Sequence, residues 1–201
     1  LSASLASDLV VQSGLLSTPF HRVYFTDQEL PDVGTIPGSA QDLPGIETLP
    51  GDRMKYPVGV RLNYHVTDFL IIKSFYRYYA DSWGVTANTF EITTPVKVSQ
   101  SLILYPFYRL LLQEQAYYFE GFGEHLRTDE FYTSDFDLST FDATKIGMGL
   151  TYAPLFGLSR FKLRKKMTVF KSFSLRYAHY SRTDGLTADV VTLGLQFKMK
   201  Q

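Results

Sequence analysis

A histidine and a serine two positions apart, His179 and Ser181, have the residue types of a base and the nucleophile that it activates. A serine hydroxyl activated by an imidazole is the arrangement that lipases and other serine hydrolases use. Their spacing places both side chains on one face of a strand, but it supplies no third group to orient the imidazole. We interpret His179 as a polar histidine at the rim of the fold. The sequence therefore predicts no catalytic site.

A short run of oxygen-bearing side chains is the best candidate for a metal site. Asp135, Asp137 and Asp142 flank Ser139, and such a set can bind calcium. The run lacks the glycine and the closing glutamate of an EF-hand loop. The four histidines are dispersed and have no metal-ligand spacing. We therefore expect a solvated acidic loop, with no metal and no cofactor.

Strict alternation of apolar and polar residues indicates the elements that carry these side chains. Between Val191 and Lys200, apolar residues occupy every odd position and Thr, Gly, Gln or Lys every even one. This period of two is typical of a strand with one apolar and one polar face. The same pattern recurs in seven earlier segments, which are residues 4–12, 58–66, 69–80, 84–95, 101–118, 145–152 and 172–178. The sequence predicts about eight strands and an all-β fold.

The connections between these strands fall into two alternating classes. One class contains the long, acidic loops of residues 15–52 and 119–143 together with the Asp184–Gly185 turn, and the other class includes the Thr67–Asp68 step. Long loops at one rim and short turns at the other are typical of an antiparallel up-and-down transmembrane β-barrel. We expect a single domain over residues 1–201, with its C-terminus in the periplasm and its long loops facing outward.

A soluble lipocalin-like barrel shows the same alternation, but its outer face mixes both signs of charge. Here the polar strand faces are rich in Gly, Ser, Thr, Arg and Gln and nearly lack acidic residues. Tyrosines gather near the strand ends, as in the aromatic girdles of outer-membrane barrels. These features favour the bacterial outer membrane, where the partners are lipid and lipopolysaccharide. The equal numbers of basic and acidic residues, 20 each, indicate no nucleic-acid partner.

The polar strand faces of such a barrel point into its lumen and carry mostly basic side chains. The expected lumen residues are Arg61, Lys73, Arg77, Glu91, Arg109, Lys145, Arg176 and Lys198. Three interpretations stay open. Glu91, tyrosines and glutamines can satisfy the basic groups in a plugged lumen, further strands can supply acids, or the lumen can attract anions.

Several segments in order resemble one known family. They are Leu16–Phe25 (LSTPFHRVYF), Arg53–Tyr64 (RMKYPVGVRLNY), Ser74–Gly84 (SFYRYYADSWG), Phe107–Gln115 and Leu138–Phe141 (LSTF). Together they resemble the DUF3570-type family of bacteria, which is thought to form outer-membrane barrels and has no established activity. Members of that family are longer at the N-terminus, which leaves room for strands before Leu1. The chain ends on Gln201 instead of the terminal aromatic residue that usually serves barrel assembly.

Three functions follow as hypotheses. The first is a non-catalytic barrel that acts as a subunit or docking element of a larger envelope complex with other outer-membrane or periplasmic proteins; its two long acidic loops suit such contacts. The second is a porin-like pore for small anionic solutes. The third is an outer-membrane lipid hydrolase that uses His179 and Ser181.

Overall fold

The computed structural model describes residues 1–26, 43–163 and 166–200, and its regular structure is almost entirely β-strand. Eight longer strands make the main sheet: β1 (Ser2–Ser7), β6 (Val58–His65), β7 (Ile71–Ala80), β8 (Thr86–Thr93), β10 (Leu102–Glu114), β11 (Phe141–Tyr152), β13 (Lys166–Arg182) and β14 (Thr187–Lys200). These strands correspond to the eight predicted from the alternation. The prediction of an all-β, antiparallel fold is confirmed.

Consecutive long strands are neighbours in this sheet, in the order β1-β6-β7-β8-β10-β11-β13, with β14 beside β13. All of these pairs are antiparallel. Gly185 takes a φ of 97° in the tight turn between β13 and β14, a backbone conformation that side-chain-bearing residues rarely adopt. The Asp184–Gly185 turn predicted from the sequence is therefore present.

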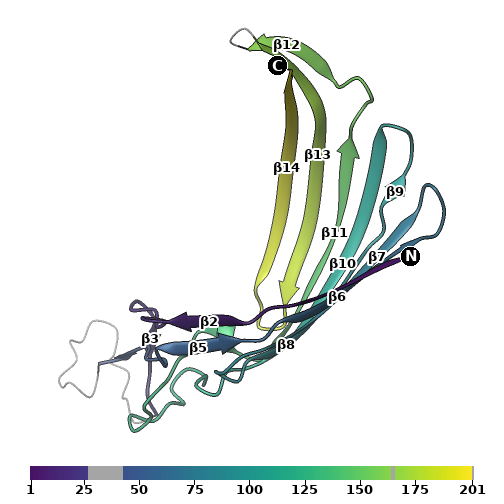
Figure 1. Ribbon diagram of the computed structural model, residues 1–201. Coiled ribbons are helices and arrows are strands. Elements are labelled where there is room, and N and C mark those ends of the chain that lie inside the picture. Colours follow the sequence, from purple (N-terminus) through teal and green to yellow (C-terminus); the bar gives the residue numbers. More distant parts are fainter. Residues whose placement is uncertain (27–42, 164–165, 201) are drawn as a thin grey trace.

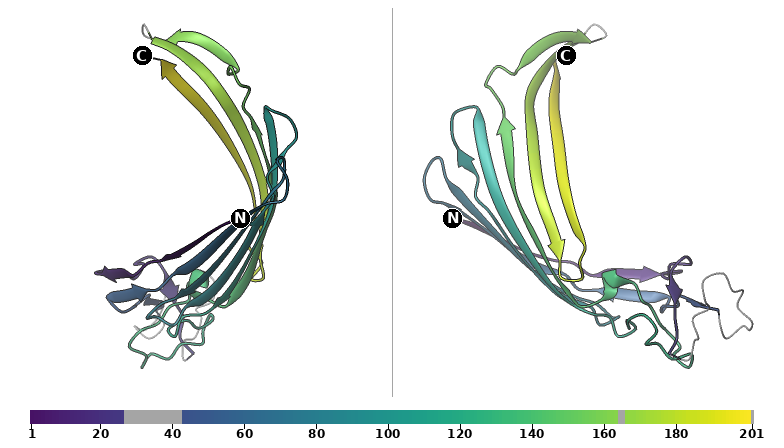
Figure 2. Two further views of the ribbon diagram at one scale, coloured as in Figure 1. Left: turned by 45° about the vertical axis from the view of Figure 1, so that its right-hand side comes forward. Right: turned by 180° about the vertical axis from the view of Figure 1, so that it is seen from behind.

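The sheet is strongly curved and open (Figures 1 and 2). Among the described strands, β1 pairs only with β6 and β14 pairs only with β13, so these two strands are its edges. The transmembrane barrel consequently stays a prediction.

Short strands complete the sheet at the end that carries the short connections. They are β9 (Val96–Lys97), paired with β10, and β12 (Ser159–Leu163), paired with β13. Pro106 lies on β10 between the stretches paired with β8 and β9. Proline has no N–H to donate, so it suits the point where the ladder is interrupted.

The opposite end carries a folded layer of connections, which we call the loop layer: residues 8–26, 43–57 and 115–140. It contains the pairs β2 (Val10–Ser13) with β5 (Asp52–Lys55) and β3 (Arg22–Val23) with β4 (Gly45–Ile46), and the 3-10 helix η2 (Phe136–Leu138). Its core consists of Leu49, Ala116 and Phe119 packed with Trp83 and Val85 from the β7–β8 turn. Part of the first predicted loop, residues 27–42, lies outside the described residues.

Candidate functional site: the concave polar face

One row of side chains crosses the sheet from the edge strand β1 to β13. The register of neighbouring strands aligns Ser4, Arg61, Phe75, Glu91, Arg109, Lys145 and Tyr180. Side chains of directly paired residues lie on the same face of a sheet. The alternation that predicted the strands thus assembles a charged ladder from residues far apart in the sequence.

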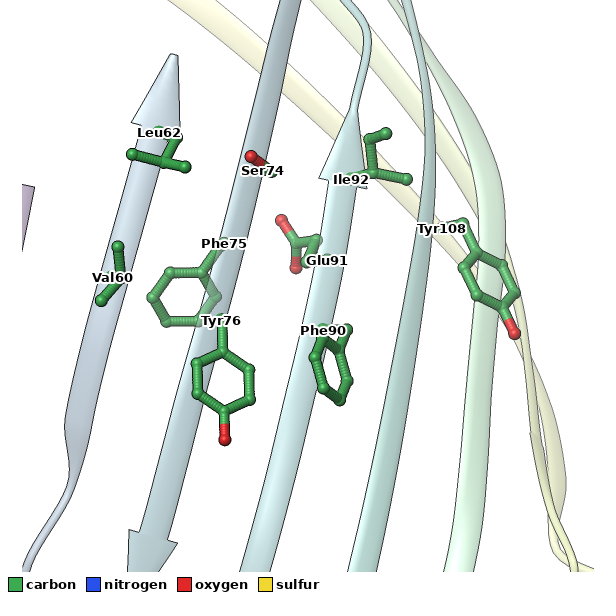
Figure 3. Close-up of a pocket in the computed structure, with 9 residues that line it drawn as sticks. All are labelled: Val60, Leu62, Ser74, Phe75, Tyr76, Phe90, Glu91, Ile92 and Tyr108. Atoms are coloured by element: carbon green, nitrogen blue, oxygen red, sulfur yellow. The ribbon is translucent and has the colours of Figure 1, made fainter. Parts of the chain in front are cut away.

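The residues next to this ladder in the sequence point to the other face. A second row of paired or nearly paired positions carries Val60, Tyr76, Phe90, Tyr108 and Ile146, and all of these except Val60 are exposed. Figure 3 shows Tyr76 and Phe90 side by side on neighbouring strands; their ring centroids are 4.8 Å apart. This face is mainly apolar, and His179 and Asp189 are among its few polar residues.

Burial identifies which face is concave. On the ladder side, Thr89, Phe107, Ala143 and Ala178 are at most 5% exposed, whereas Ile146 on the apolar side is 57% exposed. Curvature brings side chains together on the inner side of a sheet and separates them on the outer side. The ladder therefore lies on the concave face, which we call the concave polar face, and the apolar row lies on the convex face.

Acidic partners are scarce on the concave polar face. Glu91 lies 3.7 Å from Arg109 (Oε2 to Nε). Two other arginines stack on rings instead: Arg61 lies 5.3 Å from the Phe75 centroid and Arg176 lies 3.8 Å from that of Phe107. A guanidinium over a ring is stabilised by the ring's quadrupole without a carboxylate.

Two hollows open on this face. One, of about 510 Å³, is lined by Arg61, Asn63, Lys73, Glu91, Thr93 and Arg109, with Ser74 and Phe75. The other, of about 280 Å³, is lined by Arg77, Thr89, Arg109, Leu111, Lys145 and Tyr180, with Ala143 and Thr144. The Nε atom of Arg77 is buried and has no hydrogen-bond partner within the described chain. Basic groups in excess over one carboxylate give both hollows an attraction for anions.

The structure groups six of the eight residues predicted to line a lumen: Arg61, Lys73, Arg77, Glu91, Arg109 and Lys145. Arg176 is on the same face but nearer the short-connection end, over Phe107. Lys198 lies on the edge strand β14, where it pairs with Val169 of β13, and it lines neither hollow.

The three aspartates considered for calcium have separate surroundings. Asp135 accepts a hydrogen bond from the backbone N–H of Asp137 at 2.9 Å. The Asp137 carboxylate accepts one from Arg182 at 2.7 Å. Asp142 lies at the start of β11, where its backbone N–H donates to the Thr183 hydroxyl at 3.0 Å.

The loop layer instead brings histidines to carboxylates that the sequence analysis did not connect. One group is His21, Glu47 and Asp135, and another is Glu120, His125 and Asp129. The second group spans ten residues, so its composition was a usable local signal. The first group could be found only from the folded structure, because Glu47 and Asp135 are far apart in the chain.

His179 also has a carboxylate partner that was not predicted. Its Nδ1 lies 2.9 Å from Oδ1 of Asp189 on the adjacent strand β14. The Tyr177 hydroxyl donates to the same carboxylate at 2.8 Å. Within the described residues, no hydrogen bond joins Ser181 to His179. The contact with Asp189 therefore orients the imidazole of His179.

Comparison with known proteins gives a family. The model of the family described as "Protein of unknown function (DUF3570)" matches residues 3–187. The chain belongs to this family. The resemblance noted in the sequence is thereby confirmed for this DUF3570 chain. The searches of curated proteins and of solved structures gave no match.

Within residues 1–26, 43–163 and 166–200, no helix of this DUF3570 chain has the length and apolar character needed to cross a membrane.

Proposed function

We propose that this DUF3570 chain forms part of the wall of a non-catalytic transmembrane β-barrel in the bacterial outer membrane, and that its loop layer docks other envelope proteins. One observation carries the proposal: a mainly apolar convex face on eight antiparallel strands, opposite a charged concave face. Soluble domains rarely expose an apolar surface of this extent.

The convex face suits contact with lipid and lipopolysaccharide. Its large exposed apolar residues include Val58, Leu62, Tyr76, Phe90, Tyr108, Leu112, Ile146, Met148, Leu175, Tyr177, Val191 and Leu193. Outer-membrane barrels carry such an apolar band outward and a polar surface inward. Backbone groups in lipid need partners, so the proposal requires that the free edges of β1 and β14 be paired with each other or with further strands.

The loop layer suits protein contacts. It is folded around its own core, yet it exposes large apolar side chains: Leu15, Phe20, Tyr117, Phe122, Leu126 and Phe136. Exposed apolar residues on an ordered surface favour a protein partner with an apolar patch of its own. The C-terminal end of β14 lies at the other end of the sheet (Figure 1). A periplasmic C-terminus therefore puts the loop layer outside the cell.

The test is to express the protein in the envelope of a Gram-negative host and to separate the membranes. Recovery in the outer-membrane fraction, with resistance to extraction by alkaline carbonate, supports the barrel. Native mass spectrometry of the detergent extract then tests docking: a complex that is lost when Phe20 and Phe122 are changed to Ser supports it. Recovery as a carbonate-soluble protein contradicts the barrel, and a lone chain in every mild detergent contradicts docking.

A second candidate function is a pore for small anionic solutes, and the excess of basic side chains on the concave polar face favours it. Rings of Arg and Lys select for anions. In planar bilayers, we expect a reversal potential that indicates anion preference and that weakens in Arg77→Gln/Arg109→Gln protein. An absence of conductance contradicts the pore and leaves the docking function untouched.

A further inference from the structure

His125 is a buried histidine of the loop layer whose two ring nitrogens have different surroundings. Its side chain is only 2% exposed. Its Nε2 lies 2.9 Å from the carbonyl oxygen of Thr133. A carbonyl can only accept, so Nε2 carries the hydrogen and donates it. In the neutral ring, this leaves a lone pair on Nδ1.

The Thr133 carbonyl is a rigid anchor for this ring. Thr133 is fully buried, and its backbone N–H donates to the Tyr118 carbonyl at 2.9 Å. Its hydroxyl donates to the buried carboxylate of Glu47 at 2.5 Å. The same carbonyl accepts the backbone N–H of Glu120 at 3.2 Å. One backbone oxygen thereby positions both the imidazole and the neighbouring glutamate.

Nδ1 of His125 points at two carboxylates without bonding to either. It lies 3.7 Å from Oε2 of Glu120 and 3.9 Å from Oδ2 of Asp129. Both distances exceed those of hydrogen bonds, and no hydrogen bond to Nδ1 exists among the residues that the structure describes. A lone pair facing two negative groups is unfavourable, and a metal ion placed between them removes this repulsion, as a proton on Nδ1 also would.

We propose that Glu120, His125 and Asp129 bind a divalent transition-metal ion. The three ligand atoms lie within 4.8 Å of one another. An ion with metal–ligand distances of about 2.0–2.2 Å is contacted by all three after small side-chain movements. A metal-bound histidine usually donates its other N–H to a carbonyl or carboxylate, and Nε2 of His125 already does so.

The donor set decides the class of metal. One imidazole with two carboxylates suits Zn²⁺, Fe²⁺ or Mn²⁺, whereas Ca²⁺ prefers oxygen ligands alone. The ligand atoms open into a hollow of about 300 Å³ that is also lined by Tyr117, Tyr118, Glu130 and Phe131. Three protein ligands beside a hollow leave coordination positions for water or an exogenous ligand.

The experiment uses the whole chain in detergent, stripped of metal with a chelator and dialysed. Zn²⁺ is titrated by calorimetry and Co²⁺ by visible absorption. We expect saturable binding that Glu120→Gln and Asp129→Asn each weaken by about tenfold or more. Both residues are partly exposed, so these variants are expected to fold, and the fluorescence of Trp83 checks this.

Two controls separate this site from its surroundings. Glu130→Gln removes a carboxylate that lines the same hollow but lies outside the cluster, and Asp135→Asn alters the other histidine–carboxylate group. Neither is expected to change the binding that Glu120 and Asp129 support. The proposal is overturned if neither ion binds, if binding survives both ligand variants, or if Glu130→Gln weakens it equally.

Discussion

Arg53 on β5 donates a 2.9 Å hydrogen bond from Nε to the carboxylate of Asp81, just beyond the end of β7. The Asp81 side chain is fully buried and also accepts from the Tyr79 hydroxyl at 2.7 Å and the Trp83 N–H at 2.9 Å. The Arg53 guanidinium in turn lies 4.2 Å from the Trp83 ring centroid. This group of side chains connects the loop layer to the main sheet.

Replacing Asp81 by Ala should therefore destabilise the protein by about 3–5 kcal/mol, because it leaves the Arg53 charge and several donors without their partner. Urea unfolding, followed by the fluorescence of the single tryptophan, measures this. Asp68→Ala, in an exposed turn, is the matched control and should have little effect. An equal free energy of unfolding in the two variants would show that the Arg53–Asp81 contact does not stabilise the fold.

Leu110 and Leu111 on β10 test the assignment of the two faces. Leu110 pairs with Phe90 on the convex face, whereas Leu111 lines the hollow with Arg77 and Lys145. Leu110→Glu should impair membrane insertion, because it places a charge against lipid. Leu111→Glu should be tolerated beside basic groups. The heat-modifiable band in electrophoresis without boiling measures the folded fraction of each variant. A larger folded fraction for Leu110→Glu than for Leu111→Glu would contradict the assignment of the faces.

Gly147 on β11 lies where a side chain has no room. A Cβ atom there would lie 2.1 Å from the Tyr177 carbonyl oxygen of β13. We expect Gly147→Ala to lower stability by about 1–3 kcal/mol through overpacking. Gly194→Ala is the comparison, because its Cβ would meet only the Ser174 hydroxyl, which can rotate away. Thermal unfolding by circular dichroism should show the larger loss for Gly147→Ala.

The non-catalytic proposal is tested at His179 and Ser181. Asp189 orients the imidazole, but the serine is not hydrogen-bonded to it in the described structure. We expect no release of fatty acid from phospholipid vesicles by the unaltered chain, and no change with Ser181→Ala. Hydrolysis that disappears in this variant would make the chain an enzyme and overturn the proposal.

The sequence by itself determined the existence of the eight long strands and the face on which most of their side chains lie. It did not predict that β13 begins at Lys166 or that its register shifts between Phe170 and Ser172. Alternation is a local property: Arg109 and Leu110 point to opposite faces of β10 whatever surrounds them. Six of the residues predicted to line a lumen accordingly lie around two hollows on one face of the sheet. The local Asp184–Gly185 signal likewise predicted the last turn.

Only the tertiary structure decided which loop residues meet. The buried contact between Thr133 and Glu47 joins residues 86 positions apart, and the contact between Arg53 and Asp81 joins residues 28 apart. No periodic pattern links such positions, since each contact depends on how two connections pack at one end of the sheet. The aspartates that look clustered in the chain therefore take separate partners. His125 is held at Nε2 by the Thr133 carbonyl, which folding alone puts in place, and its Nδ1 faces the carboxylates of Glu120 and Asp129.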